Sequence, residues 1–340
     1  MNQPSKLLLI RFSAFGDVLL TQDLVSLLQS NIGVQEIHFL TKESNRDTCQ
    51  LYHSPQVIVH TIPNKSRFRD LYRVMRSLRA IKYDLVLDLH SNLRSRLVCW
   101  ILRRPTLRIR KQRVREFLLF AFRKVARKYY QDGPSYWRVM EGRSLLFPSQ
   151  NTARNVQSDV AIWKNSAKAD FEKYQQGLLA LPEKYICISA ESAWSFKRWP
   201  ANRFIELSDR LNRLGYSTVW LGLEKEPLLP KQSLTLDLRA QLSIDKTATI
   251  LKGAVTLVCN DTGLLHLAEM VGTPVVAVFG PTTKELGFGP RLPNSRTVEL
   301  DLWCRPCSKS GNKCHRIFNP QKCITDITVD QVYDEIQKLL

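Results

Sequence analysis

Residues 257–283, with the sequence LVCNDTGLLHLAEMVGTPVVAVFGPTT, constrain the fold of this chain more than any other stretch. The apolar run at residues 255–259 is short enough for a buried strand, and residues 275–279 form a second such run. Between them, residues 263–271 carry apolar side chains at helical spacing and are followed by glycine and proline. Strand, polar turn, helix and strand predict a βαβ unit, whose first turn lies at the edge where such sheets bind ligands.

The first turn of this unit contains Asp261, which admits two interpretations. Backbone amides at the start of the following helix, together with the positive end of the helix dipole, favour a phosphate group beside them. Alternatively, Asp261 is an N-cap whose carboxylate accepts hydrogen bonds from those amides. The spacing alone leaves both interpretations open.

Strands and helices alternate along the chain, which predicts parallel, doubly wound sheets. Strands are expected at residues 7–10, 37–40, 57–59, 84–89, 185–188, 217–221 and 234–238. One helix is expected to start at Asp17, and another to pass through residues 97–102. Further helices are expected at residues 47–52, 67–82, 202–214, 244–251 and 329–340. We predict an N-terminal domain at 1–160, an interdomain passage at 161–184, a second domain at 185–325 and a C-terminal helix at 326–340.

The charge balance indicates an anionic partner. The 340 residues have a formal net charge of +19, which favours nucleic acid, an acidic membrane face or a phosphorylated substrate. Arg11 interrupts the first apolar run, so no signal peptide is expected, and no stretch approaches the roughly 20 apolar residues of a membrane span. Eight cysteines without an export signal favour a reducing cytoplasm.

Residues 94–128 hold thirteen Lys or Arg and a single acid, Glu116. The apolar run at 117–122 lies inside this basic stretch, a composition typical of a helix in a membrane interface. A core helix with a solvated basic face fits the same periodicity. Nucleic-acid binding is the third interpretation, but no zinc finger or RNA-recognition signature is visible, so no nucleic-acid partner is expected.

Four loops are expected at the carboxyl ends of strands, where ligands bind in such folds. They are residues 11–17, 192–200, 222–224 and 261–263. We expect these loops to face a cleft between the two domains.

Several segments together resemble family 9 glycosyltransferases, the lipopolysaccharide heptosyltransferases, along nearly the full length of the chain. The matching segments are LLLIRFSAFGDVLLT, YDLVLDLHSNLRS, KRWPANRFIEL and CNDTGLLHLAEMVGTPVVAVFGPT. The resemblance implies a GT-B fold, with two Rossmann-like domains facing a cleft. It also implies inverting, metal-independent transfer from an ADP-activated heptose.

The resemblance also implies roles for individual residues. By matching position, Asp17 would be the catalytic base and Lys197 the partner of the donor diphosphate. The remaining donor contacts would be Ser192 and Thr262 at phosphate, Glu224 at the ribose, and Asp261 and His266 near the donor sugar, with Gly263 in the same turn.

The chain departs from the family pattern at two places. Ser189-Ala190 stand where the family often has Pro-Gly, and the loop at 192–196 is individual. These departures leave the identity of the donor sugar open. No Asp-x-Asp pair occurs in the sequence, so Lys197 and helix amides are the groups expected to neutralise the leaving diphosphate.

Four cysteines near the C-terminus have the spacing Cys304-x2-Cys307-x6-Cys314-x8-Cys323. Their number and first spacing suggest a structural zinc site, whereas the later spacings are not those of a standard finger. Reduced thiols or disulfides are the alternative, and catalysis should not depend on the metal.

The sequence thus predicts a cytoplasmic glycosyltransferase that is peripheral at the inner membrane. It would add a heptose-like sugar from an ADP-sugar to an anionic glycolipid, the lipopolysaccharide core. Two alternatives are a GT-B-fold transferase or epimerase using another nucleotide sugar, and a non-catalytic protein that binds membrane or nucleic acid. The residues expected to bind the acceptor's phosphates and acidic sugars are Arg94, Arg110, Lys111, Arg113 and Arg115.

Overall fold

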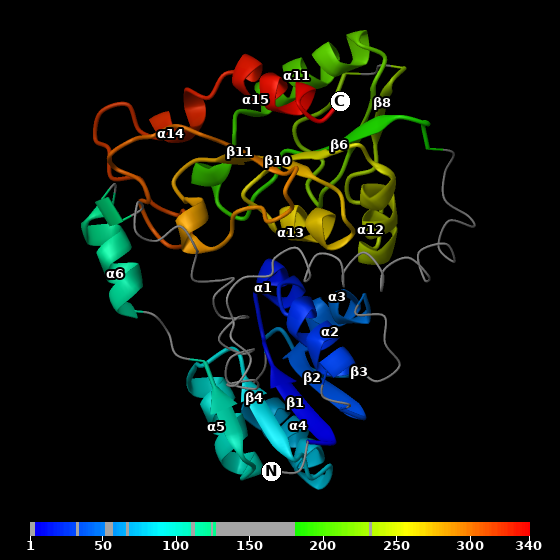
Figure 1. Cartoon of the computed structure of the whole chain (residues 1–340), viewed down its shortest axis with the longest axis vertical. Helices are drawn as coiled ribbons and strands as arrows, with labels where there is room; N and C mark the ends of the chain where they lie inside the picture. Colours follow the sequence, from blue (N-terminus) through cyan, green and yellow to red (C-terminus); the bar gives the residue numbers. More distant parts are fainter. Residues whose placement is uncertain are drawn as a thin grey trace. The chain divides into compact units, whose positions relative to one another are not determined.

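The computed structural model of the chain describes two compact α/β units (Figure 1). The described residues are 4–31, 34–51, 57–65, 68–109, 113–123, 125–126, 181–230 and 233–340. Those up to 109 belong to the first unit, and those from 113 onward belong to the second.

The first unit contains a sheet of five parallel strands in the order β3-β2-β1-β4-β5. Alternate residues of β1 point to opposite faces: Leu7 and Leu9 join the core beneath α1 and α2, and Leu8 and Ile10 join the core beneath α4 and α5. The strands are β1 (Lys6–Ile10), β2 (Glu36–Lys42), β3 (Val57–Ile62), β4 (Leu85–Asp88) and β5 (Thr106–Arg108). The helices are α1 (Phe15–Leu19), α2 (Gln22–Asn31), α3 (Arg46–Gln50), α4 (Phe68–Ala80) and α5 (Leu93–Leu102).

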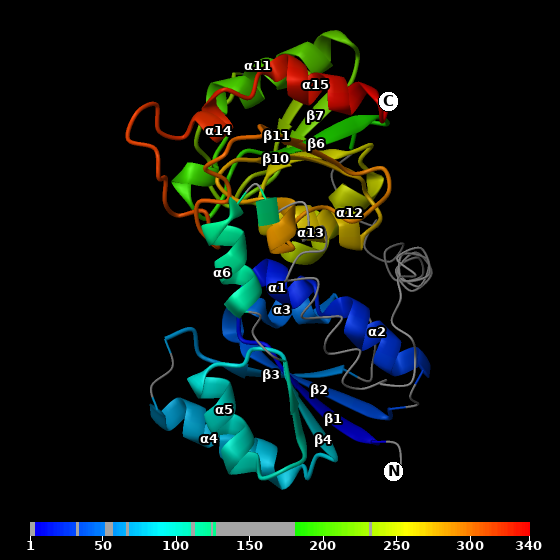
Figure 2. The same cartoon turned by 60° about the vertical axis from the view of Figure 1, so that its left-hand side comes forward.

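The second unit contains six parallel strands in the order β11-β10-β9-β6-β7-β8, with helices on both faces (Figures 1 and 2). Val276 and Val278 of β10 pack with Val332 and Ile336 of the C-terminal helix in one core. The strands are β6 (Tyr185–Ser189), β7 (Ser217–Trp220), β8 (Thr235–Asp237), β9 (Leu257–Asn260), β10 (Val275–Phe279) and β11 (Arg296–Glu299). The helices are α11 (Ala201–Arg213), α12 (Ile244–Gly253), α13 (Gly263–Met270), α14 (Lys322–Thr325) and α15 (Val329–Gln337), with short 3-10 turns η3 (Ser195–Lys197) and η4 (Lys284–Leu286).

Helix α6 (Arg113–Ala121) packs with the second unit, although the sequence-based boundaries placed it in the first domain. Leu119 is fully buried in a small core with Leu286, and Glu116 is paired with Lys309. The predicted boundary at residue 160 lies outside the described residues. None of the helices in the described ranges has the length and apolar composition needed to cross a membrane.

The predicted α/β class with two doubly wound sheets is confirmed. The short strands β5 and β11 were not predicted, because three or four residues with charged or threonine side chains give no periodic apolar signal. The helix predicted from Asp17 is interrupted, since α1 ends at Leu19 and α2 begins at Gln22.

Candidate functional site

The loops after β6 and β9 adjoin at the carboxyl edge of the second sheet, where the strand order reverses. Open α/β sheets bind ligands at such a switch point. The Ser192 hydroxyl donates to the carbonyl oxygen of Asp261 at 3.0 Å. The buried side chain of Asn260 donates to the carbonyl of Ala190 at 2.7 Å and accepts from the backbone amide of Trp199 at 2.9 Å. These bonds bring the predicted residues Ser192 and Asp261 together.

Lys197 and Asp261 form an ion pair at this edge. Lys197 ends the 3-10 turn η3, and its Nζ lies 2.6 Å from Asp261 Oδ2. The hydroxyl of Thr282, which is completely buried in the loop after β10, donates to the same oxygen at 2.6 Å. Side-chain exposure is only 12% for Lys197 and 7% for Asp261, so this is a charge-assisted contact with little water around it.

Helix α13 begins at Gly263, two residues after Asp261, and Asp261 does not cap it. The N-cap residue is Thr262, which is extended and makes no side-chain capping bond. The N-cap interpretation of Asp261 is therefore wrong, because Lys197 and Thr282 bind its carboxylate instead. Gly263 is the first residue of the helix and His266, one turn later, is buried. The start of α13 thus presents helix amides beside a lysine, a combination that favours phosphate.

Glu224 lies in the loop after β7 and forms a two-pronged ion pair with Arg198, at 2.6 and 2.7 Å. This pair ties the loop after β7 to the loop after β6, within which the Nε of Arg198 also donates to the carbonyl of Ser192 at 2.9 Å. A second carboxylate, Glu191, accepts from the backbone amides of Leu223 and Glu224 at 2.7 and 3.0 Å. The predicted ribose contact is therefore part of the same connected edge, and its carboxylate is half exposed.

Asp17 lies at the carboxyl edge of the first sheet, as the third residue of α1. Its carboxylate accepts from the backbone amide of Ala14 at 3.1 Å and lies 2.5 Å from the guanidinium of Arg11. Arg11 is buried and also donates to the carbonyl of Leu89 at 2.6 Å. Asp17 therefore makes a capping bond and an ion pair, and both contacts hold it at the loop that follows β1.

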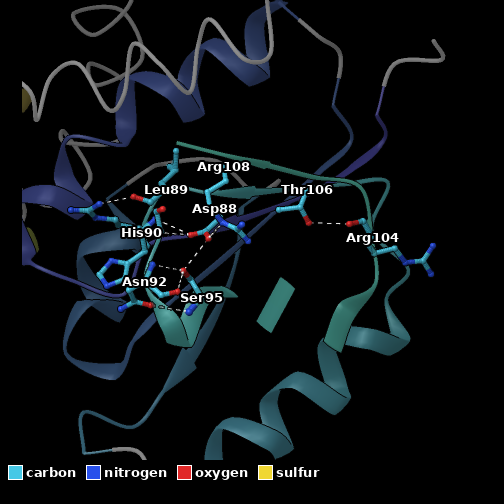
Figure 3. A network of polar contacts seen from close by, with 10 residues as sticks. Asp88, Leu89, His90, Asn92, Ser95, Arg104, Thr106 and Arg108 are labelled. Carbon is cyan, nitrogen blue, oxygen red and sulfur yellow. Dashed lines mark hydrogen bonds and ion pairs between the residues drawn. The ribbon is translucent and has the colours of Figure 1, made fainter. Parts of the chain in front are cut away.

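The loop after β4 is organised by Asp88, whose side chain is completely buried (Figure 3). Oδ1 accepts from the backbone amides of His90 and Ser91 at 3.1 and 2.7 Å. Oδ2 accepts from the hydroxyl of Ser95 at 3.0 Å and from Nε of Arg108 at 2.8 Å. The buried carboxylate thereby fixes the turn beside the Asp17 loop, because β1 and β4 are neighbouring strands.

The predicted acceptor residues are only partly described. Arg94 is exposed in the first turn of α5, in the first unit, and Arg113 is exposed at the start of α6, in the second unit. Arg110 and Lys111 lie outside the described residues, and the side chain of Arg115 is not described. Of these five side chains, the structure thus describes only Arg94 and Arg113, and the acceptor site stays a prediction.

The four C-terminal cysteines are free thiols, and those of Cys304, Cys307 and Cys323 are buried. Burial raises the pKa of Cys323 to about 12 and also raises that of Cys307, so these thiols are neutral when no metal is bound. Cys314 is partly exposed, and its sulfur accepts from the backbone amide of Gln321 at 3.4 Å. No group of three or more His, Cys, Asp or Glu side chains in the described ranges is arranged to hold a metal, so the structure does not show the predicted zinc site.

Sequence reasoning missed the residues that hold the predicted ones in place. Thr282 comes three residues after the last predicted strand of the βαβ unit, and this position after a strand was the available signal. Asp88 and Arg108 pair between the ends of β4 and β5, which required knowledge of a strand that the sequence did not reveal. The other missed residues are Arg11, Glu191, Arg198 and Asn260.

A family model described as glycosyltransferase family 9 (heptosyltransferase) matches residues 71–317 of the chain. This match covers most of the chain, including both loops that contact Asp261. Among curated proteins, lipopolysaccharide heptosyltransferase 1 of Pseudomonas aeruginosa is 24% identical over 374 residues, covering 98% of each chain.

Solved structures share the fold. A family 9 glycosyl transferase from Veillonella parvula has a TM-score of 0.70 at 20% identity, covering 100% of this chain and 98% of that one. An Escherichia coli heptosyltransferase solved with ADP has a TM-score of 0.64 at 19% identity. The match covers 98% of this chain and 97% of that one. At these identities the likeness shows the two-sheet architecture of the GT-B fold, and the sites have to be argued from this chain's own residues.

Proposed function

Because the chain belongs to glycosyltransferase family 9, the heptosyltransferases, we propose that it moves a heptose from ADP-heptose to a lipopolysaccharide core acceptor by an inverting, metal-independent reaction. One observation supports this proposal above the others. Lys197, fixed by Asp261 and Thr282, lies at the loop that leads into α13, where a leaving diphosphate needs positive charge.

The donor would bind along the carboxyl edge of the second sheet. The diphosphate would lie at Lys197 and the first amides of α13, with the Ser192 hydroxyl and Thr262 as further phosphate contacts. Glu224 would accept hydrogen bonds from the ribose hydroxyls, and Arg198 keeps that carboxylate oriented by binding both of its oxygens. We propose ADP as the nucleotide of the donor because the similar Escherichia coli heptosyltransferase was solved with ADP.

The proposed chemistry is a single displacement at the anomeric carbon of the donor sugar. An acceptor hydroxyl attacks this carbon while the bond to the diphosphate oxygen breaks, which inverts the configuration. The hydroxyl proton passes to the carboxylate of Asp17, and the diphosphate leaves with additional negative charge that Lys197 stabilises. The buried Arg11 guanidinium keeps Asp17 in one orientation for this transfer.

We further propose a peripheral location at the cytoplasmic face of the inner membrane. Helix α6 exposes Val114 and Phe117, at 73% and 66%, next to the basic side chain of Arg113. Figures 1 and 2 both show α6 beside the loop at 303–318, which exposes Ile317 and Phe318. Exposed apolar side chains among basic residues suit an anionic lipid surface.

A thermal-shift panel of nucleotide sugars tests the donor assignment, because a ligand that binds only the folded state raises the melting temperature. We expect ADP and ADP-heptose to stabilise the protein, with UDP-sugars and GDP-sugars having little effect. Stabilisation by another nucleotide sugar would favour a different transferase or an epimerase. Absence of any stabilisation would favour a non-catalytic binding protein.

A further inference from the structure

Gly311 lies against the aliphatic stem of Lys197. A β-carbon on Gly311 would lie 2.5 Å from Lys197 Cε and 2.9 Å from Cγ, closer than β-carbons approach other atoms in proteins. Gly311 also has a φ of +71°, a conformation that glycine adopts without strain. Two independent constraints therefore select glycine here, and one of them is contact with the lysine proposed to bind the donor diphosphate.

The segment that carries Gly311 is anchored by Arg305, which is completely buried. Its guanidinium lies 2.7 Å from Glu299 and donates to the carbonyl of Phe279 at 3.2 Å and to that of Thr282 at 2.8 Å. It also donates to the carbonyl of Gly280. One buried arginine thus ties this segment to the end of β10 and to the loop after it.

Further bonds close the chain around Gly311. The backbone amide of Cys307 donates to the carbonyl of Pro281 at 2.8 Å. The hydroxyl of Ser308 donates to Asn312 Oδ1 at 3.0 Å and accepts from the backbone amide of Asn312 at 3.2 Å. Gly311 therefore lies inside a cross-linked turn rather than on a free loop.

Thr282 connects this turn to the other end of the lysine. Its carbonyl accepts from Arg305, and its hydroxyl donates to the Asp261 oxygen that binds Lys197 Nζ. The segment 305–312 therefore acts on Lys197 twice: Gly311 restricts the stem, and Arg305 holds the residue that orients the partner carboxylate. A lysine side chain is flexible, so fixing it at both ends lowers the entropy lost when it binds a ligand.

We propose that residues 305–312 are a positioning segment that holds the Lys197 ammonium in place for the donor diphosphate, with Gly311 and Arg305 as positioning residues. The segment would act through Lys197 and Asp261 without touching the donor. This inference rests on the proposed function, because it takes Lys197 as the group that binds the diphosphate.

Gly311→Ala tests the proposal, with Gly215→Ala as a matched control. Gly215 has a φ of +84°, but nothing lies within 4 Å of an added β-carbon there, so the control carries backbone strain alone. We expect Gly311→Ala to weaken ADP binding about tenfold in calorimetry, the size of one lost charge-assisted contact. AMP has no diphosphate to reach Lys197, so its affinity should change much less, and both variants should melt at similar temperatures.

A double-mutant cycle separates positioning from general damage. If Gly311 acts through Lys197, Gly311→Ala should weaken ADP binding no further when Lys197→Ala is already present. In the steady state, Gly311→Ala should lower kcat as well as raise the donor KM, because Lys197 is proposed both to bind the diphosphate and to stabilise it as it leaves.

Three results would overturn the inference. Gly311→Ala could bind ADP as tightly as Gly215→Ala, or lose equal affinity for AMP and ADP, or lose as much in the Lys197→Ala background as alone. If the wild-type protein bound neither ADP nor ADP-heptose, the proposed function would fail together with this inference. Wild-type binding that Gly311→Ala leaves unchanged would remove only the inference.

Discussion

Lys197 Nζ lies 2.6 Å from Asp261 Oδ2, and both side chains are almost entirely shielded from water. An ion pair in such surroundings is strong only when its remaining hydrogen-bonding groups are satisfied, and Thr282 supplies a second donor to the same carboxylate oxygen. The ammonium is therefore held at the head of α13 before any donor arrives, which is the condition for a preorganised electrostatic site.

Replacing Lys197 by alanine tests whether this cation stabilises the leaving diphosphate. We expect turnover to fall by roughly 100-fold or more, as for comparable electrostatic groups, while the protein stays folded. Lys246→Ala, at an exposed position of α12, is the control and should retain activity. Activity within a few-fold of wild type, or loss of wild-type activity on adding a chelator, would contradict the assignment.

Asp17→Asn distinguishes a catalytic base from a helix cap. Asparagine caps about as well as aspartate but cannot accept the acceptor's proton, so turnover should fall by roughly 100-fold or more. Asp47→Asn is the matched control, since Asp47 is an exposed acid in the first turn of α3. ADP affinity should persist in both variants, whereas Asp17→Asn should also lower the melting temperature because it removes the charge partner of the buried Arg11, so activity is compared well below that temperature. Near-normal turnover of Asp17→Asn would place the base elsewhere.

The membrane proposal predicts vesicle binding that depends on charge and on exposed apolar side chains. Binding to anionic vesicles should weaken steeply as the salt concentration rises. It should also weaken when the basic residues at positions 110, 111, 113 and 115 are replaced by serine, and in Phe117→Ser. Arg213→Ser, an exposed change on α11, should have little effect. Equal binding to neutral and anionic vesicles would count against this surface, and tight duplex DNA binding at physiological salt would favour a nucleic-acid partner instead.

A histidine pair in the first unit should make its stability sensitive to acid. His38 Nδ1 lies 2.8 Å from His60 Nε2, and the Nε2 of His38 lies 3.2 Å from Glu36. Burial, and then the neighbouring His38, lower the pKa of His60 from 6.5 to about 4. Burial also lowers the pKa of His38, against the opposing effect of Glu36, which is itself paired with Lys6.

Because the folded-state pKa of His60 lies below its unfolded value, the neutral pair stabilises the fold fully above pH 6.5. That contribution is lost as the pH falls from 6.5 toward 4, where the unfolded chain binds protons first. We expect the free energy of unfolding, from urea titrations, to fall more steeply over this window in wild type than in His60→Leu. Parallel slopes for the two proteins would contradict the prediction.

The sequence predicted the sheets well because buried parallel strands are apolar runs that need no knowledge of their partners. The run at 275–279, for example, is β10 with every residue buried. The positions of Asp17, Ser192 and Asp261 could also be predicted, because the carboxyl ends of parallel strands fix which loops share an edge.

Contacts between distant segments could not be predicted in the same way. Asp261 had the local pattern of an N-cap, and only the folded chain brings Lys197, 64 positions away, and Thr282 to its carboxylate. Cysteine spacing suggested zinc, but spacing along the chain does not report how thiols lie in space, and the described residues include no group arranged to hold a metal. No sequence pattern indicated a role for Gly311, because the side chain that it contacts, Lys197, lies 114 positions earlier in the chain.

The most direct test of the proposed function is product analysis with ADP-heptose and defined lipopolysaccharide core acceptors. We predict that mass spectrometry will show one added heptose, that ADP will be released in equal amount, and that EDTA will not change the rate. Nuclear magnetic resonance should show a new glycosidic bond of anomeric configuration opposite to that of the donor. Retained configuration, or ADP release without a heptosylated product, would contradict the proposal.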